Sequence, residues 1–269
     1  MKKFLNLACG DYFINSKNWI NCDFAPQSKY VRQMDLQKKF TFDTSSFDLV
    51  YCSHYIEHIN LNQVSDFINQ CFQVLKNNGI IRLVLPDFEN IAREYVKNID
   101  SNQMQFASFN IAEMIDQCVR RVSGGSLQKW YDKSRYDEAL SEYVYSRTGF
   151  KYKEKQDFKH NIIIRLRRLT LKKLILKIQS RSIFLVIRFL PDWFKKNHIT
   201  EVSTGEQHLW VHDFYSVKSI LEKNGFSEVK RVSAHYSQEI DFPLYPLDVN
   251  SENHARKGKE SMYIEARKT

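Results

Sequence analysis

The chain has 269 residues, of which 43% are apolar and 26% are charged, and this composition excludes collagen-like, rod-like coiled-coil and wholly disordered proteins. Its length suits one or two domains. The formal net charge is +9, but residues 151–198 alone hold 14 Lys/Arg against three Asp/Glu, a local charge of +11 that leaves −2 for the rest. The basic character therefore belongs to one segment and not to the whole fold.

The five cysteines form no C-x-x-C pair and lie mostly within apolar runs, which is typical of reduced, packed thiols in a cytoplasmic protein. The apolar stretch after Met1 is too short for a secretion signal. No run of 18 uncharged apolar residues exists, because Arg188 interrupts the best candidate. We therefore expect a cytoplasmic protein without a membrane span.

Four short apolar runs in the first part of the chain predict buried strands. They span residues 4–8, 19–23, 47–52 and 80–85. Between the third and fourth runs, apolar residues from Val64 to Leu75 recur at spacings of three and four, which predicts a helix that ends at Asn77-Asn78-Gly79 in a left-handed cap. Strands joined through a helix indicate βαβ units and a parallel sheet.

The sheet pattern resumes near the carboxyl end, where Ser216 is placed to cap a helix that Gly225 stops, and where residues 229–234 and 262–266 predict two more strands. The stretch between these two parts contains helix-like segments at residues 91–96, 104–122 and 136–145, and the basic region. We therefore expect one α/β domain formed by residues 1–86 and 213–269, with residues 87–212 inserted as a mainly helical, acceptor-binding region.

Gly10 and Asp23 follow the first two predicted strands, and parallel sheets bind ligands at this edge. A carboxylate after the second strand can accept both hydroxyls of a ribose, and Gly10 lets the backbone approach a ligand closely. A dinucleotide site needs G-x-G-x-x-G, but Ala8 stands at the first glycine position and no third glycine exists. A phosphate-free ribose ligand relaxes that requirement. Taken singly, Gly10 could equally end a strand and Asp23 begin a turn.

Five motifs follow one another along the chain, and their order and spacing are more specific than any one motif alone. They are Leu5-Asn6-Leu7-Ala8-Cys9-Gly10, Trp19-Ile20-Asn21-Cys22-Asp23, Asp35-Leu36, residues 46–59 and Leu83-Val84-Leu85-Pro86-Asp87. In this order the chain resembles class I S-adenosylmethionine-dependent methyltransferases of the type 11 kind, in particular a small bacterial branch associated with cell-surface polysaccharide biosynthesis. The resemblance implies a Rossmann-like fold with a mostly parallel seven-stranded sheet, an antiparallel last strand and a large helical insertion.

The resemblance also implies S-adenosylmethionine as the cofactor and assigns its contacts. The expected contacts are Ala8, Cys9 and Gly10 for the methionine and ribose, Asp23 for the ribose hydroxyls, Asp35 and Leu36 for the adenine, and Ser53 and His54 beside the sulfonium. The chain departs from the family pattern in two places. Ala8 replaces the first glycine, and any helix between the first two strands must be very short.

In-line methyl transfer to a hydroxyl needs a proton acceptor close to the methyl group. Two clusters offer one, and their members are His54, Glu57 and His58 in the first and Glu206, His208, His212 and Asp213 in the second. We predict His208 as the acceptor-site base, with His54 and Glu206 as the other catalytic candidates.

Both clusters have a simpler interpretation. Glu57-His58 could serve only to orient its loop. His208 and His212 have the spacing of a helical metal pair, but no second strong ligand set accompanies them, so we expect no metal.

Residues 160–190 interleave an apolar helical stripe with eight Lys/Arg. A basic amphipathic helix is typical of a protein that lies on an anionic membrane surface, and equally of a lid whose stripe packs on its own domain. Aromatic residues are nearly absent from residues 160–183, which argues against base stacking and therefore against nucleic acid as a partner.

These observations predict a methyltransferase that O-methylates a small-molecule or glycan acceptor, of which a saccharide or a lipid-linked glycan fits best. We expect it in the cytoplasm, in peripheral contact with the inner face of the membrane. The alternative from another class is a non-catalytic module of the same fold that binds anionic membrane or RNA through residues 151–198. RNA methylation is a second enzymatic alternative, and it predicts steeply salt-dependent binding.

Overall fold

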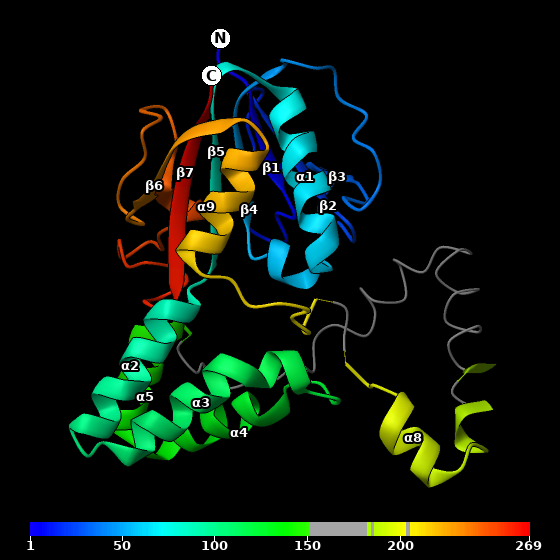
Figure 1. The fold of residues 1–269 in the computed structure, drawn as a ribbon, viewed down its shortest axis with the longest axis vertical. Coiled ribbons are helices and arrows are strands. Elements are labelled where there is room, and N and C mark those ends of the chain that lie inside the picture. The colour runs from blue at the N-terminus through cyan, green and yellow to red at the C-terminus, as the bar shows by residue number, and fades with distance from the viewer. Residues whose placement is uncertain (151–181, 184–185, 203–204) are drawn as a thin grey trace.

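The computed structural model describes residues 1–150, 182–183, 186–202 and 205–269, and everything below concerns these residues. One seven-stranded sheet, in the order β3-β2-β1-β4-β5-β7-β6, forms the body of the molecule (Figure 1). Its strands are β1 (Phe4–Leu7), β2 (Trp19–Asp23), β3 (Val31–Gln33), β4 (Phe47–Ser53), β5 (Leu75–Pro86), β6 (Phe226–Val232) and β7 (Ser261–Lys268). Strands β1 to β5 pair in parallel, and β7 runs antiparallel to both β5 and β6. The predicted α/β fold is confirmed.

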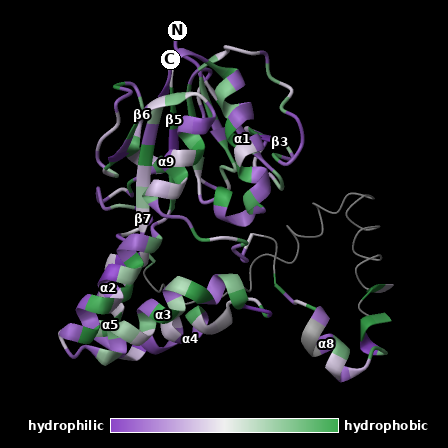
Figure 2. Cartoon of the chain, in the orientation of Figure 1, coloured by the Kyte–Doolittle hydropathy of each residue, from purple (hydrophilic) through white to green (hydrophobic). Residues whose placement is uncertain are grey.

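The helical elements fall into two groups, one beside the sheet and one inserted after β5. Those of the sheet domain are η1 (Ile56–His58), α1 (Leu61–Val74), α9 (Phe214–Lys223) and α10 (Leu244–Leu247). Those between β5 and α9 are α2 (Phe88–Asp100), α3 (Met104–Val119), α4 (Gly125–Lys133), η2 (Ser134–Tyr136), α5 (Glu138–Thr148) and α8 (Asp192–His198). Helices α1, α9 and α3 alternate between hydrophobic and hydrophilic residues, as amphipathic helices do (Figure 2).

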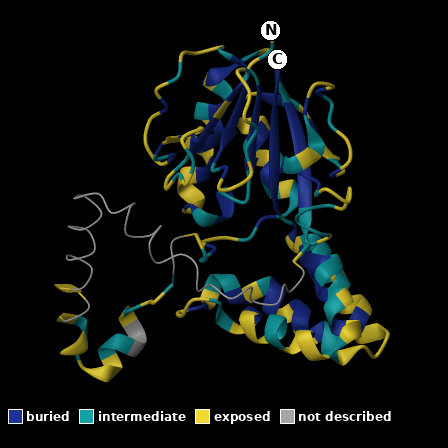
Figure 3. Ribbon diagram, turned by 180° about the vertical axis from the view of Figure 1, so that it is seen from behind, coloured by how far each residue is buried: buried dark blue, intermediate teal, exposed yellow. Residues whose placement is uncertain are grey.

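The two faces of the sheet are covered differently. Helices α1 and α9 cover one face, where their apolar side chains, such as Ile68 and Leu221, pack on the strands in the larger core cluster (Figure 1). The other face is covered by residues 233–255, which contribute Phe242 and Leu247 to a second apolar cluster. The strands between the two coverings are largely buried (Figure 3).

Helices α2 to α5 form a cap at the end of the sheet where β5 terminates (Figure 1). The cap has an apolar cluster of its own, which includes Phe109, Leu127 and Leu140. The helix-like segments expected at 91–96, 104–122 and 136–145 correspond to α2, α3 and α5, whereas α4 has no counterpart among the predicted elements.

Several local expectations were wrong. Helix α1 ends at Val74 and not at Asn77-Asn78-Gly79, because Leu75 already pairs with Phe47 in the sheet. The left-handed residue at that point is Asn78, with φ +63°, and it lies within β5.

The cap of α9 and the edge of the sheet also differ from expectation. Asp213 caps α9, and the expected cap Ser216 instead closes the capping box from the third position of the helix. The chain between β1 and β2 contains turns and no helix. Strand β3 was not predicted, because it has only three residues and one buried side chain.

All five cysteines are free, and all but Cys118 are buried. Most of the basic stripe at 160–190 lies outside the described residues. Among the described helices, none is both long and apolar enough to cross a bilayer.

Candidate functional site

Two adjoining cavities open at the carboxyl ends of β1, β2 and β4. The first, of about 540 Å³ and here called the strand-end cavity, is lined by Asp23, Asp35 and Leu36 among others. The second, of about 340 Å³ and here called the cap-side cavity, is bounded on the cap side by Gln117 of α3. The residues that line both cavities are Ala8, His54, His58 and Gly205.

The eight residues predicted to contact the cofactor all border at least one of these two cavities. Those on the strand-end cavity are Ala8, Asp23, Asp35, Leu36 and His54, and those on the cap-side cavity are Ala8, Cys9, Gly10, Ser53 and His54. The predicted base His208 borders the cap-side cavity. The topology thus brings together residues that lie far apart in the sequence, because the strands that carry them end at one edge of the sheet.

The carboxylate of Asp23 connects the ends of the first two strands. Its Oδ2 accepts a hydrogen bond from the backbone N–H of Gly10 at 2.9 Å, and its Oδ1 accepts one from the backbone N–H of Ala25 at 2.9 Å. A carboxylate has about four acceptor positions, so two remain for the hydroxyls of a ribose. Gly10 adopts φ +52° with open space where a Cβ would stand, which leaves its backbone accessible from the cavity.

Ala8 and His54 adopt left-handed backbone conformations at the ends of β1 and β4, with φ +53° and φ +52°. Such a conformation costs a residue with a Cβ about 1–2 kcal/mol. The cost identifies the two strand ends as strained positions at the wall that the cavities share.

Glu57 lies at the centre of a histidine cluster immediately after β4. Its side chain is buried, and neither of its carboxylate oxygens has a hydrogen-bond partner among the described residues. Nδ1 of His54 lies 3.2 Å from Oε1 of Glu57, outside hydrogen-bond geometry. The rings of His58 and His208 meet edge to face, with their centroids 4.8 Å apart.

Each histidine of the cluster has an orienting contact. Nε2 of His54 lies 3.0 Å from the Ser261 hydroxyl, and Nδ1 of His58 lies 2.8 Å from the carbonyl oxygen of Gln207, to which it donates. Nε2 of His208 lies 2.9 Å from the side-chain amide of Gln117. These contacts fix the rings of His54 and His58 at the boundary between the two cavities and the ring of His208 on the cap-side cavity.

Burial governs the protonation of the cluster. It lowers the pKa of His54 to about 4 and that of His208 to about 3, so both rings are uncharged at neutral pH. Burial acts to raise the pKa of Glu57, but His54, His58 and His208 outweigh it and hold that pKa at about 2. The histidines lower the pKa of Glu57 fully only when their rings carry a positive charge. At neutral pH the rings of His54 and His208 are uncharged, and the carboxylate of Glu57 is then a buried anion without a hydrogen bond.

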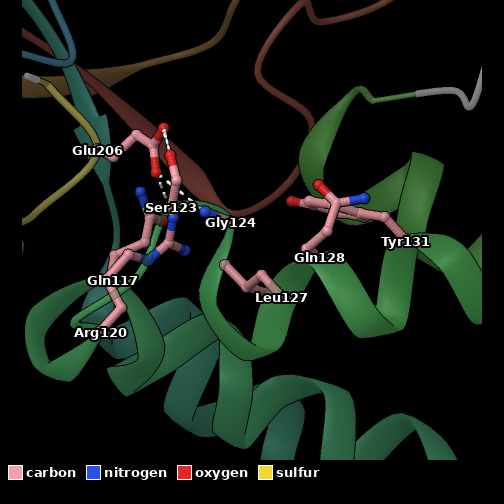
Figure 4. A pocket seen from close by; sticks show the side chains of 8 residues that line it. All are labelled: Gln117, Arg120, Ser123, Gly124, Leu127, Gln128, Tyr131 and Glu206. Carbon is pink, nitrogen blue, oxygen red and sulfur yellow. Dashed lines mark hydrogen bonds and ion pairs between the residues drawn. The ribbon is translucent and has the colours of Figure 1, made fainter. Parts of the chain in front are cut away.

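Glu206, the third catalytic candidate, lies elsewhere. Its carboxylate accepts hydrogen bonds from the Ser123 hydroxyl and, at 3.0 Å, from the backbone N–H of Gly124 (Figure 4). It lines a third cavity of about 460 Å³ between α3 and α4, here called the outer cavity. Gln117 borders both this cavity and the cap-side cavity, so the outer cavity adjoins the site without bringing Glu206 to the histidines.

Sequence reasoning missed three polar residues of the cap-side cavity, namely Gln117, Arg256 and Lys257. The guanidinium carbon of Arg256 lies 3.8 Å from the centre of the Tyr12 ring, and Nε donates to the carbonyl oxygen of Leu247 at 2.7 Å. Arg256 and Lys257 lie in an irregular loop before β7, where no periodicity marks them. They give this cavity a positive wall.

Comparison with known proteins finds one family that part of the chain resembles. Residues 11–83 match the sequence model of the family described as a methyltransferase domain. No curated protein matches the chain. The match makes residues 11–83 similar to a methyltransferase domain, and the sheet around them has the mostly parallel order that the sequence predicted.

Solved structures also match, at low identity. An S-adenosylmethionine-dependent methyltransferase from Mesorhizobium loti is 17% identical over 34% of this chain, with a TM-score of 0.28, and this chain covers about half (49%) of its length. One from Archaeoglobus fulgidus is 13% identical and covers 99% of this chain and 86% of its own, with a TM-score of 0.41. One from Thermotoga maritima is 10% identical, and the match covers 100% of this chain and 83% of the other, with a TM-score of 0.43.

Proposed function

We propose that the protein transfers a methyl group from S-adenosylmethionine to a hydroxyl of a saccharide or lipid-linked glycan. The observation that carries this proposal is the shared wall of the two cavities. The strand-end cavity offers the carboxylate and apolar groups that suit an adenosine, and the cap-side cavity adjoins it at Ala8, His54 and His58. The adenosine would occupy the strand-end cavity, the methionine part would pass this wall to Cys9, Gly10 and Ser53, and the acceptor would meet it in the cap-side cavity.

The chain's own residues have separate tasks in this proposal. Asp23 holds the ribose hydroxyls, Asp35 and Leu36 border the adenine, and residues 8–10 approach the methionine part. Ser53 and His54 lie beside the sulfonium. When bound, the cofactor supplies an electrophilic methyl group, and the protein's contribution is to orient the acceptor oxygen in line with it and to exclude water.

The acceptor enters from the side of the cap. Gln117 borders both the cap-side cavity and the outer cavity, so the two lie next to each other on this side. The outer cavity is lined largely by polar side chains, including Gln117, Gln128 and Glu206, with Tyr131 as an aromatic surface (Figure 4). Such a lining suits hydroxyl-rich ligands. His208 is the proposed acceptor-site base, because its uncharged ring faces the cap-side cavity.

Cofactor binding tests the first half of this proposal. S-adenosylhomocysteine, titrated calorimetrically into the full chain, should bind at micromolar concentrations or below. Asp23→Ala should weaken binding at least tenfold, because a hydrogen bond to a charged group contributes about 1.5–3 kcal/mol. Asp66→Ala, which removes an exposed carboxylate of α1 that borders neither cavity, is the control. Wild-type protein that does not bind, or Asp23→Ala that binds equally well, would exclude the proposal.

Acceptor specificity tests the second half. Radiolabelled methyl transfer is measured with saccharide, lipid-linked glycan and RNA acceptors in parallel. Labelling of the glycans with release of S-adenosylhomocysteine supports the proposal. Labelling of RNA alone would instead identify the nucleic-acid alternative.

We also propose that the region around α8 contacts an anionic membrane. Its described residues expose Ile183, Val186, Phe189 and Trp193 at helical spacing, and Phe189 and Trp193 are 85% and 64% exposed. The stretch just before α8 is hydrophobic (Figure 2). Exposed apolar side chains beside basic ones are typical of interfacial segments.

Vesicle flotation tests this contact. Full-length protein should float with anionic vesicles and not with neutral ones, and the double variant F189S/W193S should lose flotation. Tyr136→Ser is the control, because Tyr136 is 89% exposed but lies in the cap. Equal flotation of the double variant and the control would refute this contact.

A further inference from the structure

The carboxylate of Glu57 is the least satisfied charged group in the described part of the chain. The residue is only 1% exposed, and neither oxygen has a hydrogen-bond partner. Its backbone is nevertheless firmly held, because the carbonyl oxygen of Glu57 accepts a hydrogen bond from the N–H of Leu209 at 2.7 Å. A buried carboxylate needs either a proton, a full set of donors or a cation. Because this bond holds the main chain of Glu57, the chain cannot shift to bring the carboxylate to a donor. The described residues therefore supply neither a full set of donors nor a cation for this carboxylate.

Two imidazoles lie beside this carboxylate in positions that suit ligation. The donor atoms of Glu57, His58 and His208 all lie within 4.8 Å of one another. Adjacent nitrogen and oxygen donors bound at 2.0–2.2 Å to one ion lie about 3–3.6 Å apart. The three donors therefore need to close by at most roughly 1–2 Å, which side-chain rotation can supply, to surround one ion.

The surroundings of both histidines match those of metal ligands. His58 donates from Nδ1 to the carbonyl oxygen of Gln207, which leaves Nε2 as the unprotonated nitrogen. Nε2 of His208 faces the side-chain nitrogen of Gln117, which can only donate and so leaves the ring proton on Nδ1. Ligation through Nδ1 therefore requires the Gln117 amide to be turned over, so that Nε2 donates to its oxygen. Ligating histidines typically hold their second nitrogen in this way, which fixes the tautomer and the ring orientation.

We propose that Glu57, His58 and His208 bind one divalent transition-metal ion, with an open coordination position toward the cap-side cavity. Two imidazoles and one carboxylate suit zinc, manganese, iron or cobalt. Both histidines line that cavity, so the open position faces the acceptor. This differs from the expectation of no metal, which considered the His208 and His212 spacing. The ligands come instead from η1 and from a loop about 150 residues later, which no local spacing can reveal.

The role of the ion rests on the proposed methyl transfer. A coordinated acceptor hydroxyl loses its proton to solvent more readily, because the metal stabilises the alkoxide. The oxygen then forms the O–CH3 bond as the S–CH3 bond breaks, and uncharged S-adenosylhomocysteine leaves. With the ion bound, His208 is a ligand in place of the base proposed above, and the acceptor needs no strong protein base.

Metal binding is tested on the full chain after treatment with a chelator. Zn²⁺ and Mn²⁺ are titrated calorimetrically, and Co²⁺ is followed by its visible absorption. We expect one ion per chain, and a loss of affinity of at least 100-fold in Glu57→Gln and His208→Asn. His198→Asn, at an exposed position of α8, is the control and should bind like wild type.

The wild-type protein alone can refute the site, even if a ligand variant fails to fold. A Co²⁺ spectrum identical to that of the aqueous ion, or no calorimetric binding of any of the three ions, overturns the proposal. So does equal affinity in folded Glu57→Gln and wild type. S-adenosylhomocysteine binding separates this result from the proposed function: it should persist in Glu57→Gln while methyl transfer falls. If wild type binds metal but no S-adenosylhomocysteine, the methyltransferase proposal fails and the metal site stands.

Discussion

The two faces of the sheet are buried by different means. On the helix-covered face, the apolar sides of α1 and α9 pack against apolar strand residues in the larger core cluster. On the other face, an irregular segment is held by the fully buried Arg82 of β5. Arg82 pairs with Asp248 and Glu265 at 2.6 Å each, and it donates to the carbonyl oxygens of Ser233 and Tyr236 at 3.1 Å.

This contrast shows what replaces long helices over a sheet, since the covering segment contains only the short α10. A helix satisfies its own backbone, whereas an irregular covering segment needs external donors for its carbonyl groups. One guanidinium supplies several of these donors and also faces the rings of Phe242 and Tyr263. Burial opposes the charge of Arg82, but Asp248 and Glu265 raise its pKa above the ordinary value and keep it protonated.

The largest expected effect is that of Arg82→Met. It leaves two buried carboxylates without their cation, so we expect a loss of about 3–5 kcal/mol in the free energy of unfolding, measured by urea denaturation. The triple variant R82M/D248N/E265Q removes all three charges and should recover part of the loss. If the single and triple variants are equally unstable, packing and not charge holds this face.

The second effect measures the helix-covered face. Ile68 of α1 is 1% exposed in the larger core cluster. Ile68→Ala should cost about 3 kcal/mol, since it removes three carbons and leaves a cavity. Ile68→Val, as the graded control, should cost about 1 kcal/mol. Because no charge is involved, both values should be the same at pH 6 and pH 8, and a strong dependence would contradict the apolar account.

A smaller effect tests how much a single buried hydrogen bond stabilises the face that residues 233–255 cover. The hydroxyl of Tyr51 donates to Oδ1 of Asp248 at 2.8 Å in the buried cluster around Arg82. Tyr51→Phe removes this single donor, and a hydrogen bond to a charged group is worth about 1.5–3 kcal/mol. The double variant Y51F/D248N should lose less than the sum of the single variants, because the two groups interact directly. Strict additivity would show that the bond contributes nothing.

The contrast between the faces also explains what could be predicted from the sequence. The stripes from Val64 to Leu75 predicted α1 because apolar periodicity is a local signal. The buried charge of Arg82 left no such signal, since its partners lie more than 150 residues away. The same holds at the site: Gly10 and Asp23 follow strands that the pattern located, whereas Gln117, Arg256 and the grouping of Glu57 with His208 depend on tertiary contacts.

The smallest effect concerns the start of α9 on the helix-covered face. Asp213 accepts from the backbone N–H of Ser216 at 2.8 Å, and the N–H of Asp213 donates to the Ser216 hydroxyl at 3.2 Å. Asp213→Ala should cost about 1 kcal/mol in the free energy of unfolding, the usual value of a lost N-cap.

This contribution should depend on pH, because the bonds from Ser216 lower the pKa of Asp213 below its ordinary 3.8. The charge-dependent part of the stabilisation is therefore complete above pH 3.8 and is lost as the pH falls through the lower, folded-state value. Urea denaturation should show the gap between wild type and Asp213→Ala narrowing below that pH, whereas Asp213→Asn, which still caps the helix without a charge, should stay close to wild type at pH 7. A gap that is constant with pH would mean that the cap acts as a neutral acceptor only, and that the helix-covered face depends on electrostatics even less than its apolar packing implies.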